Sequence, residues 1–146
     1  MQPENGIKPL FPALQGKSML DLGCGYGWHC RFAADQGAER VLGLDLSTKM
    51  IAEAKRRSAG SLIEYRVCGI EAYEYPKNEW DCAVSNLALH YIKNLDQIFQ
   101  KVHQTLKPGG IFIFNIEHPV FTAAAGQDWI YTDTGTPLYW PVDSYF

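Results

Sequence analysis

Long apolar runs are missing from this sequence. The longest ones stop far short of the ~20 residues that a membrane-spanning helix needs, although 47% of the 146 residues are hydrophobic. Residues 1–10 mix Glu4, Lys8 and two prolines with few apolar residues, so they lack the apolar centre of a secretory signal. We expect one soluble domain without membrane contact, because a chain of this length can bury a core without disulfides.

Cysteine pairs are missing as well. The four cysteines, Cys24, Cys30, Cys68 and Cys82, lie far apart and form neither a Cys-x-x-Cys pair nor a metal-binding repeat. This spacing argues against zinc or another metal site. It indicates reduced thiols in a cytoplasmic protein, because disulfides persist mainly in oxidising compartments.

Basic residues are fewer than acidic ones in this sequence. Thirteen Lys and Arg residues against 16 Asp and Glu residues give a formal net charge of −3. General nucleic-acid binding needs many Lys and Arg contacts to phosphates, so the composition argues against nucleic acid as a partner. The only basic cluster, Lys49 with residues 55–57, is interpreted as the solvated face of a helix.

Five short apolar runs alternate with stretches of helical periodicity. Such alternation predicts an α/β fold in which repeated strand–helix units form a parallel sheet. The intervening helices are expected to end near Gly37 and Gly60, and to have N-caps at Ser47 and Asn94. Residues 107–110, Lys-Pro-Gly-Gly, should stop the third helix. The five runs span residues 18–22, 41–45, 62–67, 80–85 and 111–115.

The last thirty residues differ in composition and periodicity from the core, which spans about residues 15–116. Residues 117–146 are rich in aromatics, prolines and turn residues and show no clear period of either kind. This pattern predicts a loop-like excursion within the single domain, either a lid or binding loop or the beginning of a longer region.

Three glycines alternate where the first run ends, in the segment Asp21-Leu-Gly-Cys-Gly-Tyr-Gly27. Glycine allows positive φ and close approach of a ligand, and the N-terminus of a following helix offers N–H groups to an anionic group. Asp45 ends the second run. Because ligands of an open parallel sheet bind beyond the carboxyl ends of its strands, Asp45 is placed to bind ribose hydroxyls.

The glycine spacing separates two classes of nucleotide. The dinucleotide fingerprint Gly-x-Gly-x-x-Gly would put its third glycine at position 28, which is Trp28. Asp21 would repel a pyrophosphate but suits a cation, and S-adenosylmethionine (SAM) carries both an ammonium and a sulfonium. The segment therefore favours SAM over NAD or FAD, with a tight turn that binds no ligand as the simplest alternative.

Four segments together resemble the successive motifs of class I SAM-dependent methyltransferases. They are DLGCGYG at 21–27, VLGLDLS at 41–47, SNLALHY at 85–91 and LKPGG at 106–110. The resemblance covers roughly residues 15–120, and residues 117–121 and 127–129 are similar to a subgroup of small bacterial enzymes of this type. It implies a Rossmann-like, open and mainly parallel sheet of about five strands, with helices on both faces.

The resemblance implies how the methionyl part of SAM is held. The glycine loop would bed it, and Asp21 would reach its amino group directly or through water. Asn86, at the end of the fourth run, would face it through a backbone carbonyl. The loop residues concerned are Gly23, Cys24, Gly25 and Gly27.

An adenosine site is implied in the same way. Asp45 would bind the ribose, and Leu46 would lie against the adenine. After the third strand the family often has an acidic residue that binds the adenine amino group, but this sequence has Gly69 there. Packing by Ile70, with the backbone of Ile70 or Glu71, must then supply more of the adenine contact.

A catalytic base is optional in this chemistry. Methyl transfer from a sulfonium is an in-line displacement, so placing the acceptor supplies much of the rate. If the acceptor must lose a proton, His118 is the first candidate, because it follows the fifth run and imidazole titrates near neutral pH. His90 is the second. Either histidine can instead be a pocket wall or a structural hydrogen-bond donor.

The sequence departs from the family after the fifth run. The family places an antiparallel hairpin of two further strands there, and this sequence ends at Phe146 without them. We therefore expect a domain truncated at its C-terminus, with residues 111–114 as an edge that pairs in a homodimer or is covered by the tail. Two interpretations of the tail aromatics stay open, an acceptor pocket or a cover for exposed core. They are Trp129, Tyr131, Tyr139 and Trp140.

Three functions follow, in order of preference. The first is a SAM-dependent methyltransferase that methylates a small-molecule acceptor and releases S-adenosylhomocysteine (SAH). The second is a SAM-binding remnant or interaction domain without turnover, which would bind SAM and transfer no methyl group. The third is an NAD-type oxidoreductase, which would bind a nicotinamide cofactor and not SAM.

Overall fold

The structure is a computed structural model that describes residues 6–123, 126 and 128–142. The chain divides into two units, Met1–Ile116 and Glu117–Phe146, and each is described by itself. Whether the two units act as a single domain stays a prediction. Gln127, in one of the segments that resemble the bacterial subgroup, lies outside the described residues.

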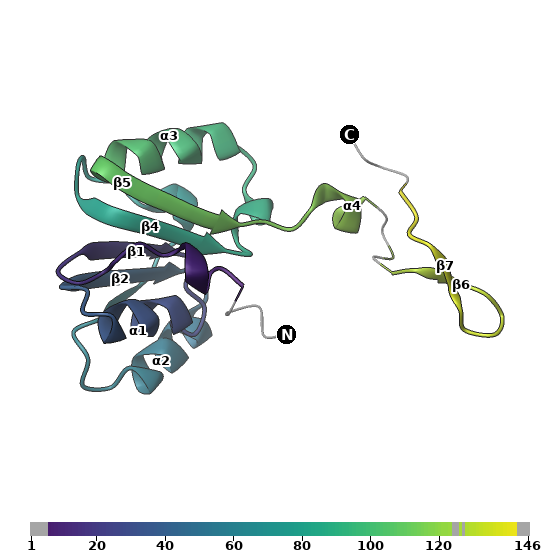
Figure 1. Ribbon diagram of the computed structural model, residues 1–146, viewed down its shortest axis with the longest axis horizontal. Helices are drawn as coiled ribbons and strands as arrows, with labels where there is room; N and C mark the ends of the chain where they lie inside the picture. The colour runs from purple at the N-terminus through teal and green to yellow at the C-terminus, as the bar shows by residue number, and fades with distance from the viewer. Residues whose placement is uncertain (1–5, 124–125, 127, 143–146) are drawn as a thin grey trace. The chain divides into compact units, whose positions relative to one another are not determined.

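Five parallel strands form the sheet of the first unit (Figure 1). They are β1 (Ser18–Leu22), β2 (Arg40–Asp45), β3 (Glu64–Val67), β4 (Trp80–Asn86) and β5 (Leu106–Asn115). The order β3-β2-β1-β4-β5 puts the first strand at the centre, where all of its residues are buried. Leu20 pairs with Leu42 on one side and Ala83 on the other. The predicted α/β fold with a parallel sheet is confirmed.

Two strand boundaries differ from the prediction by more than one residue. β3 begins at Glu64 instead of residue 62, because its ladder with β2 begins there and Leu62 is 96% exposed. β5 begins at Leu106, directly after the third helix, instead of at residue 111. The ladder with β4 shifts register after the Trp80–Leu106 pair, and Gly109 is left-handed. These two features let β5 continue through residues 107–110, which were expected only to stop the helix.

Three α-helices lie between the strands of the first unit, with short 3-10 helices at Ile70–Ala72 and Leu89–Tyr91. The α-helices are α1 (Trp28–Asp35), α2 (Thr48–Arg57) and α3 (Leu95–Thr105). The side chain of Ser47 accepts the backbone N–H three residues on at 3.3 Å, and that of Asn94 does the same at 3.1 Å. Both predicted N-caps are therefore confirmed. Gly37 and Gly60 lie just beyond α1 and α2, each with a φ of 82°.

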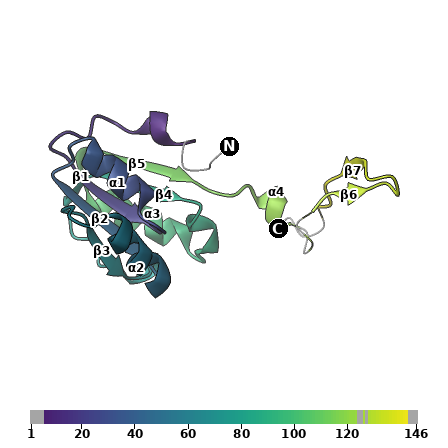
Figure 2. The same cartoon turned by 90° about the horizontal axis from the view of Figure 1, so that it is seen from below.

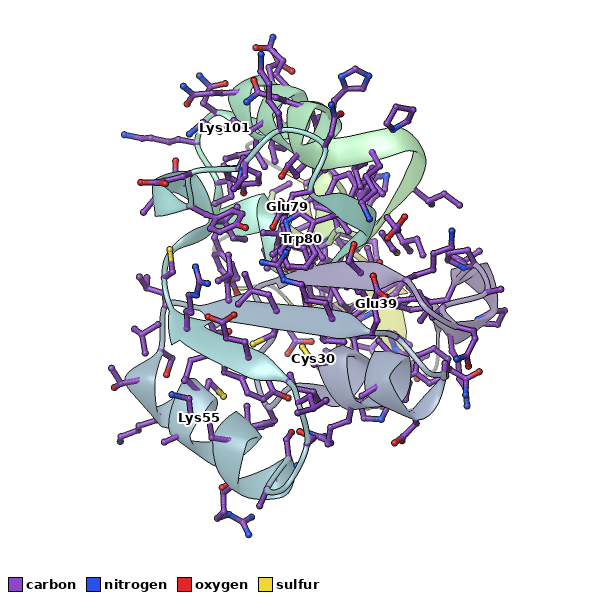
Figure 3. All side chains as sticks on the ribbon, turned by 90° about the vertical axis from the view of Figure 1, so that its left-hand side faces the viewer. Cys30, Glu39, Lys55, Glu79, Trp80 and Lys101 are labelled. Atoms are coloured by element: carbon purple, nitrogen blue, oxygen red, sulfur yellow. The ribbon has the colours of Figure 1, made fainter. Side chains whose placement is uncertain are left out.

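In Figure 2, α1 and α2 lie on the face of the sheet that is turned to the viewer. The two faces of the sheet bury separate cores. Met19 packs with Cys30 of α1, whereas Leu20 packs with Trp80 and with Ile98 of α3. Figure 3 shows these layers, with Cys30 between α1 and the sheet and Trp80 towards α3. Since neighbouring residues of a strand point to opposite faces, the expected helices on both faces are confirmed.

The second unit contains a short helix and a hairpin. They are α4 (Pro119–Thr122), β6 (Ile130–Tyr131) and β7 (Pro137–Tyr139), the two strands being antiparallel. The indole N–H of Trp140 donates to the Val120 carbonyl at 2.7 Å, and its ring lies 5.9 Å from that of Trp129. The tail, which was expected to be loop-like, thus contains three short elements, and elements this short leave no period in a sequence.

The four cysteines are free thiols, and all are buried except Cys68, which is half-buried. Among residues 6–123, 126 and 128–142, no three His, Cys, Asp or Glu side chains gather as a metal site would require. No helix in that part of the chain is long and apolar enough to cross a membrane.

Candidate functional site

The glycine loop joins β1 to α1 at the carboxyl edge of the sheet. Gly23, Gly25 and Gly27 have φ values of 78°, 51° and 74°, which other L-residues adopt only with strain. The backbone N–H groups of Gly23 and Cys24 both donate to the Leu44 carbonyl at 2.8 Å. The loop is therefore anchored on the end of β2.

The three glycines face different surroundings. A Cβ at Gly23 would lie 2.5 Å from the Cβ of Ala88, and a Cβ at Gly27 would overlap the hydroxyl of Tyr65. A Cβ at Gly25 would meet no atom within 4 Å. Gly23 and Gly27 are thus required by close packing, whereas Gly25 leaves open space that a ligand can enter.

Asp45 ties this loop to the start of α2. Its Oδ2 accepts the N–H of Gly25 at 2.9 Å, and its Oδ1 accepts the N–H of Ser47 at 2.8 Å. The side chain is half-buried. A carboxylate has about four lone-pair positions, so Asp45 can still accept hydrogen bonds from two hydroxyl groups.

A pocket of about 410 Å³ opens beside Asp45 at this edge. Two of the large hydrophobic side chains that line it are mostly exposed to solvent, Leu46 at 78% and Tyr91 at 81%. We call these two residues the open wall. The structure brings five of the predicted site residues together here. The complete lining is Gly23, Asp45, Leu46, Cys68, Gly69, Ile70, Glu71, Leu87, Ala88, Tyr91 and Ile92.

Asp21 lies beneath the loop instead of lining the pocket. It is fully buried, its Oδ2 accepts the Cys30 thiol at 3.4 Å, and His29 Nδ1 is 3.8 Å away. Among the described residues its Oδ1 has no hydrogen-bond partner. Burial raises the pKa of Asp21 to about 7 and lowers that of His29 to about 4. The predicted contact of Asp21 with an amino group stays a prediction.

Cys24 also points away from the pocket. Its sulfur and that of Cys30 each lie 2.9 Å from the position that a Cβ on Gly43 would take, and Tyr65 Cδ1 lies at 2.8 Å. These buried side chains support the glycine loop from below. We call Asp21, Cys24, Cys30 and Tyr65 the loop floor.

Asn86 and the two histidines do not line the pocket. The Oδ1 of Asn86 accepts the side-chain N–H of Asn115 at 3.1 Å, so a ligand contact would use its backbone, as expected. The ring of His90 lies 4.2 Å from that of Tyr91, with the two planes tilted by 47°. His118 belongs to the second unit and caps α4, where its Nδ1 accepts the Val120 N–H at 3.2 Å. Catalytic roles for both histidines stay predictions.

Sequence reasoning did not assign six of the pocket residues. They are Cys68 and Gly69, which precede Ile70, and the four that follow β4: Leu87, Ala88, Tyr91 and Ile92. The motif at 85–91 pointed to this segment but not to the side chains that turn inward. Leu87 has a φ of 55°, which is rare for leucine and leads the chain from β4 back over the loop at Gly23. No local pattern in the sequence indicates that turn.

Most of the first unit matches a known protein family. Residues 20–114 match the methyltransferase domain family, and the chain belongs to it. The resemblance drawn from the four motifs to class I methyltransferases is therefore confirmed, as is the Rossmann-like fold that it implied.

Individual relatives extend the match beyond the motifs. An uncharacterized protein of Haemophilus influenzae is 33% identical over 143 residues, which are 93% of this chain and 56% of the relative. A malonyl-[acyl-carrier protein] O-methyltransferase of Enterobacter lignolyticus is 38% identical over 103 residues, 70% of this chain and 40% of its own. This chain thus spans about half the length of these curated relatives.

A solved structure agrees with the fold closely. A Listeria monocytogenes protein described as a SAM-dependent methyltransferase is 46% identical, with a TM-score of 0.92. The match covers 98% of this chain and 67% of that one.

Proposed function

We propose that this chain binds SAM at the carboxyl edge of its sheet and acts as a SAM-dependent methyltransferase on a small-molecule acceptor. The observation that carries the proposal is the pocket in which Asp45 stands beside the glycine loop and an exposed apolar wall. The family of the chain and the description of the Listeria protein support it.

The residues present fit the parts of SAM. The free acceptor capacity of Asp45 suits the ribose hydroxyls. Leu46 and Ile70 offer apolar surface to the adenine ring, and covering them removes apolar area from water at about 25 cal/mol per Å². Glu71, at the pocket rim, lies near the adenine in this arrangement. The open space at Gly25 accepts the methionyl part.

When bound, SAM supplies an electrophilic methyl group on a sulfonium. The chain contributes position, because the loop and Asp45 hold the donor while an acceptor is brought into line with the methyl group. An acceptor with a proton to lose would need a base, for which we propose His118 and, second, His90. Nδ1 of His118 accepts the Val120 N–H, so the neutral ring carries its proton on Nε2. To act as a base, His118 must release the Val120 N–H and present a nitrogen lone pair to the acceptor.

Calorimetry with SAH tests the proposal, because the product occupies the same site without reacting. We expect one site for SAH and none for NAD. Leu46→Asp should weaken SAH at least about tenfold, since it places a charge against the adenine. Leu62→Asp is the matched control, because Leu62 is 96% exposed and lies outside the pocket. A folded wild-type protein that does not bind SAH would contradict the proposal.

SAM binding without turnover is the alternative function. The exposure of Leu46 and Tyr91 favours it, because methyl transfer benefits from exclusion of water around the donor. The two functions separate in an assay of SAH formation from SAM with a panel of small hydroxyl, amine and carboxylate acceptors. Bound SAM with no SAH formed would favour the binding domain.

We also propose a homodimer and a cytoplasmic location. β5 lies at an edge of the sheet, and Ile111 and Phe114 on it are 42% and 44% exposed. Such an edge is a template for a strand of a second copy. Sedimentation should show a dimer that Phe114→Lys converts to a monomer, and a monomeric wild-type protein would contradict the proposal.

A further inference from the structure

Tyr65 connects three elements beneath the glycine loop. It is in β3 and only 5% exposed. Its hydroxyl lies 2.9 Å from the Ser58 hydroxyl at the end of α2 and donates to the Gly27 carbonyl at 3.5 Å. Gly27 is the left-handed residue that precedes α1. A side chain of the third strand therefore touches the last glycine of the loop.

Two glycines leave the room that this side chain occupies. A Cβ at Gly43 would lie 2.8 Å from Cδ1 of the Tyr65 ring, and a Cβ at Gly27 would overlap the Tyr65 hydroxyl. Gly43 is not one of the glycines with a positive φ. Its lack of a side chain therefore serves close packing and not an unusual backbone conformation. The ring of Tyr65 thus extends from the middle of β2 to the loop.

The hydroxyl is suited to a fixed donor role. Burial raises the pKa of Tyr65 to about 12, so the proton stays on the oxygen at neutral pH. If Tyr65 donates to Gly27, the Ser58 hydroxyl donates to Tyr65, and both polar groups are satisfied in a buried place. Ser58 then determines which way the Tyr65 proton points.

We infer that Tyr65 is a positioning residue, which holds the Gly27 turn in the conformation that receives the methionyl part of SAM. The inference rests on the proposed SAM site. A contribution of Tyr65 to folding alone would affect all parts of the site alike. Because Tyr65 contacts the loop and does not line the pocket in which adenosine is proposed to bind, a positioning role affects the methionyl part selectively.

Calorimetry with two ligands tests this role. SAH carries the amino acid part that the loop would hold, whereas 5′-methylthioadenosine has the same adenosine without it. Tyr65→Phe keeps the ring over Gly43 and removes only the hydroxyl. We expect a loss of about three- to tenfold in SAH affinity, the range of one hydrogen bond, and less than about twofold for 5′-methylthioadenosine.

Two further variants complete the experiment. Ser58→Ala removes the partner of the Tyr65 hydroxyl and should give a smaller loss with the same preference for SAH. Tyr73→Phe is the matched control, because Tyr73 is also buried and accepts one hydrogen bond, from Trp80, outside the pocket. It should leave both affinities unchanged.

The outcomes are distinct. Equal losses for both ligands, or no loss for either, in folded Tyr65→Phe and Ser58→Ala proteins would overturn the positioning role while leaving the SAM site standing. A folded wild-type protein that binds neither ligand would refute the proposed function, and this inference with it.

Discussion

The loop floor and the open wall border the same glycine loop but are built from opposite kinds of surface. Asp21 and Cys30 of the floor are 0% exposed, whereas Leu46 and Tyr91 of the wall are 78% and 81% exposed. Apart from Oδ1 of Asp21, the floor therefore already has its contacts within the described part of the chain, whereas the wall is exposed to solvent. Substitutions in the floor should change stability, and substitutions in the wall should change ligand affinity alone.

The largest effect is expected from the charge buried in the floor. The pKa of Asp21 is raised to about 7 by burial, against about 3.9 in an unfolded chain. The folded protein therefore binds more protons than the unfolded one between these pH values. The stability that Asp21 contributes is fully present below about pH 4 and is lost as the pH rises through about 7.

Asp21→Asn removes this titration while keeping the shape of the side chain. The free energy of unfolding of the wild type, relative to Asp21→Asn, should fall by about 2–4 kcal/mol between pH 4 and 8. His29, whose pKa is lowered to about 4, loses its own contribution as the pH falls below about 6.5, but it is present in both proteins and cancels. Urea unfolding at several pH values measures the difference, and a pH-independent difference would contradict the prediction.

Close packing in the floor gives the next effect. Gly43→Ala should destabilise the fold by about 1–3 kcal/mol, because the new methyl group overlaps two sulfurs and the Tyr65 ring at 2.8–2.9 Å. Gly69→Ala is the control, since its Cβ would meet only Leu46 at 3.6 Å. Thermal unfolding of both variants is the measurement. Equal unfolding midpoints for the two variants would mean that the loop floor rearranges around the new methyl group without loss of stability.

Substitution of Gly25 tests whether the glycine loop affects ligand affinity as well as stability. Gly25→Ala and Gly16→Ala both put alanine at a positive φ, 51° and 66°, with no atom within 4 Å of the new Cβ. Both should lose about 1–2 kcal/mol of stability from backbone strain. Only Gly25→Ala should also weaken SAH, because its methyl group enters the proposed site. Similar SAH affinities for the two variants would remove Gly25 from that site.

The smallest effect on stability is expected at the wall. Leu46→Asp should leave the free energy of unfolding within about 0.5 kcal/mol of the wild type, as for other surface changes, although it weakens SAH. A larger loss of stability, measured by urea unfolding against Leu62→Asp, would show that the wall is part of the core after all.

The strands and caps could be predicted because their causes are local. The N-caps at Ser47 and Asn94 depend on residues three positions away, and the buried strands are continuous apolar runs. The boundary at Leu106 was missed because it depends on pairing with Trp80 in β4. The hairpin of β6 and β7 was missed because strands of two and three residues show no alternation.

The glycine loop and Asp45 were visible in the sequence because a left-handed turn demands glycine and a strand end places its carboxylate. The sequence by itself thus determined the family and the sheet, and it pointed to the carboxyl edge of the sheet for the proposed site. Tertiary structure alone decided that Asp21 is buried beneath the loop, that Ala88 and Tyr91 border the pocket, and that Tyr65 reaches Gly27. These contacts join residues far apart in the chain, and only the packing of the sheet against its helices brings them together.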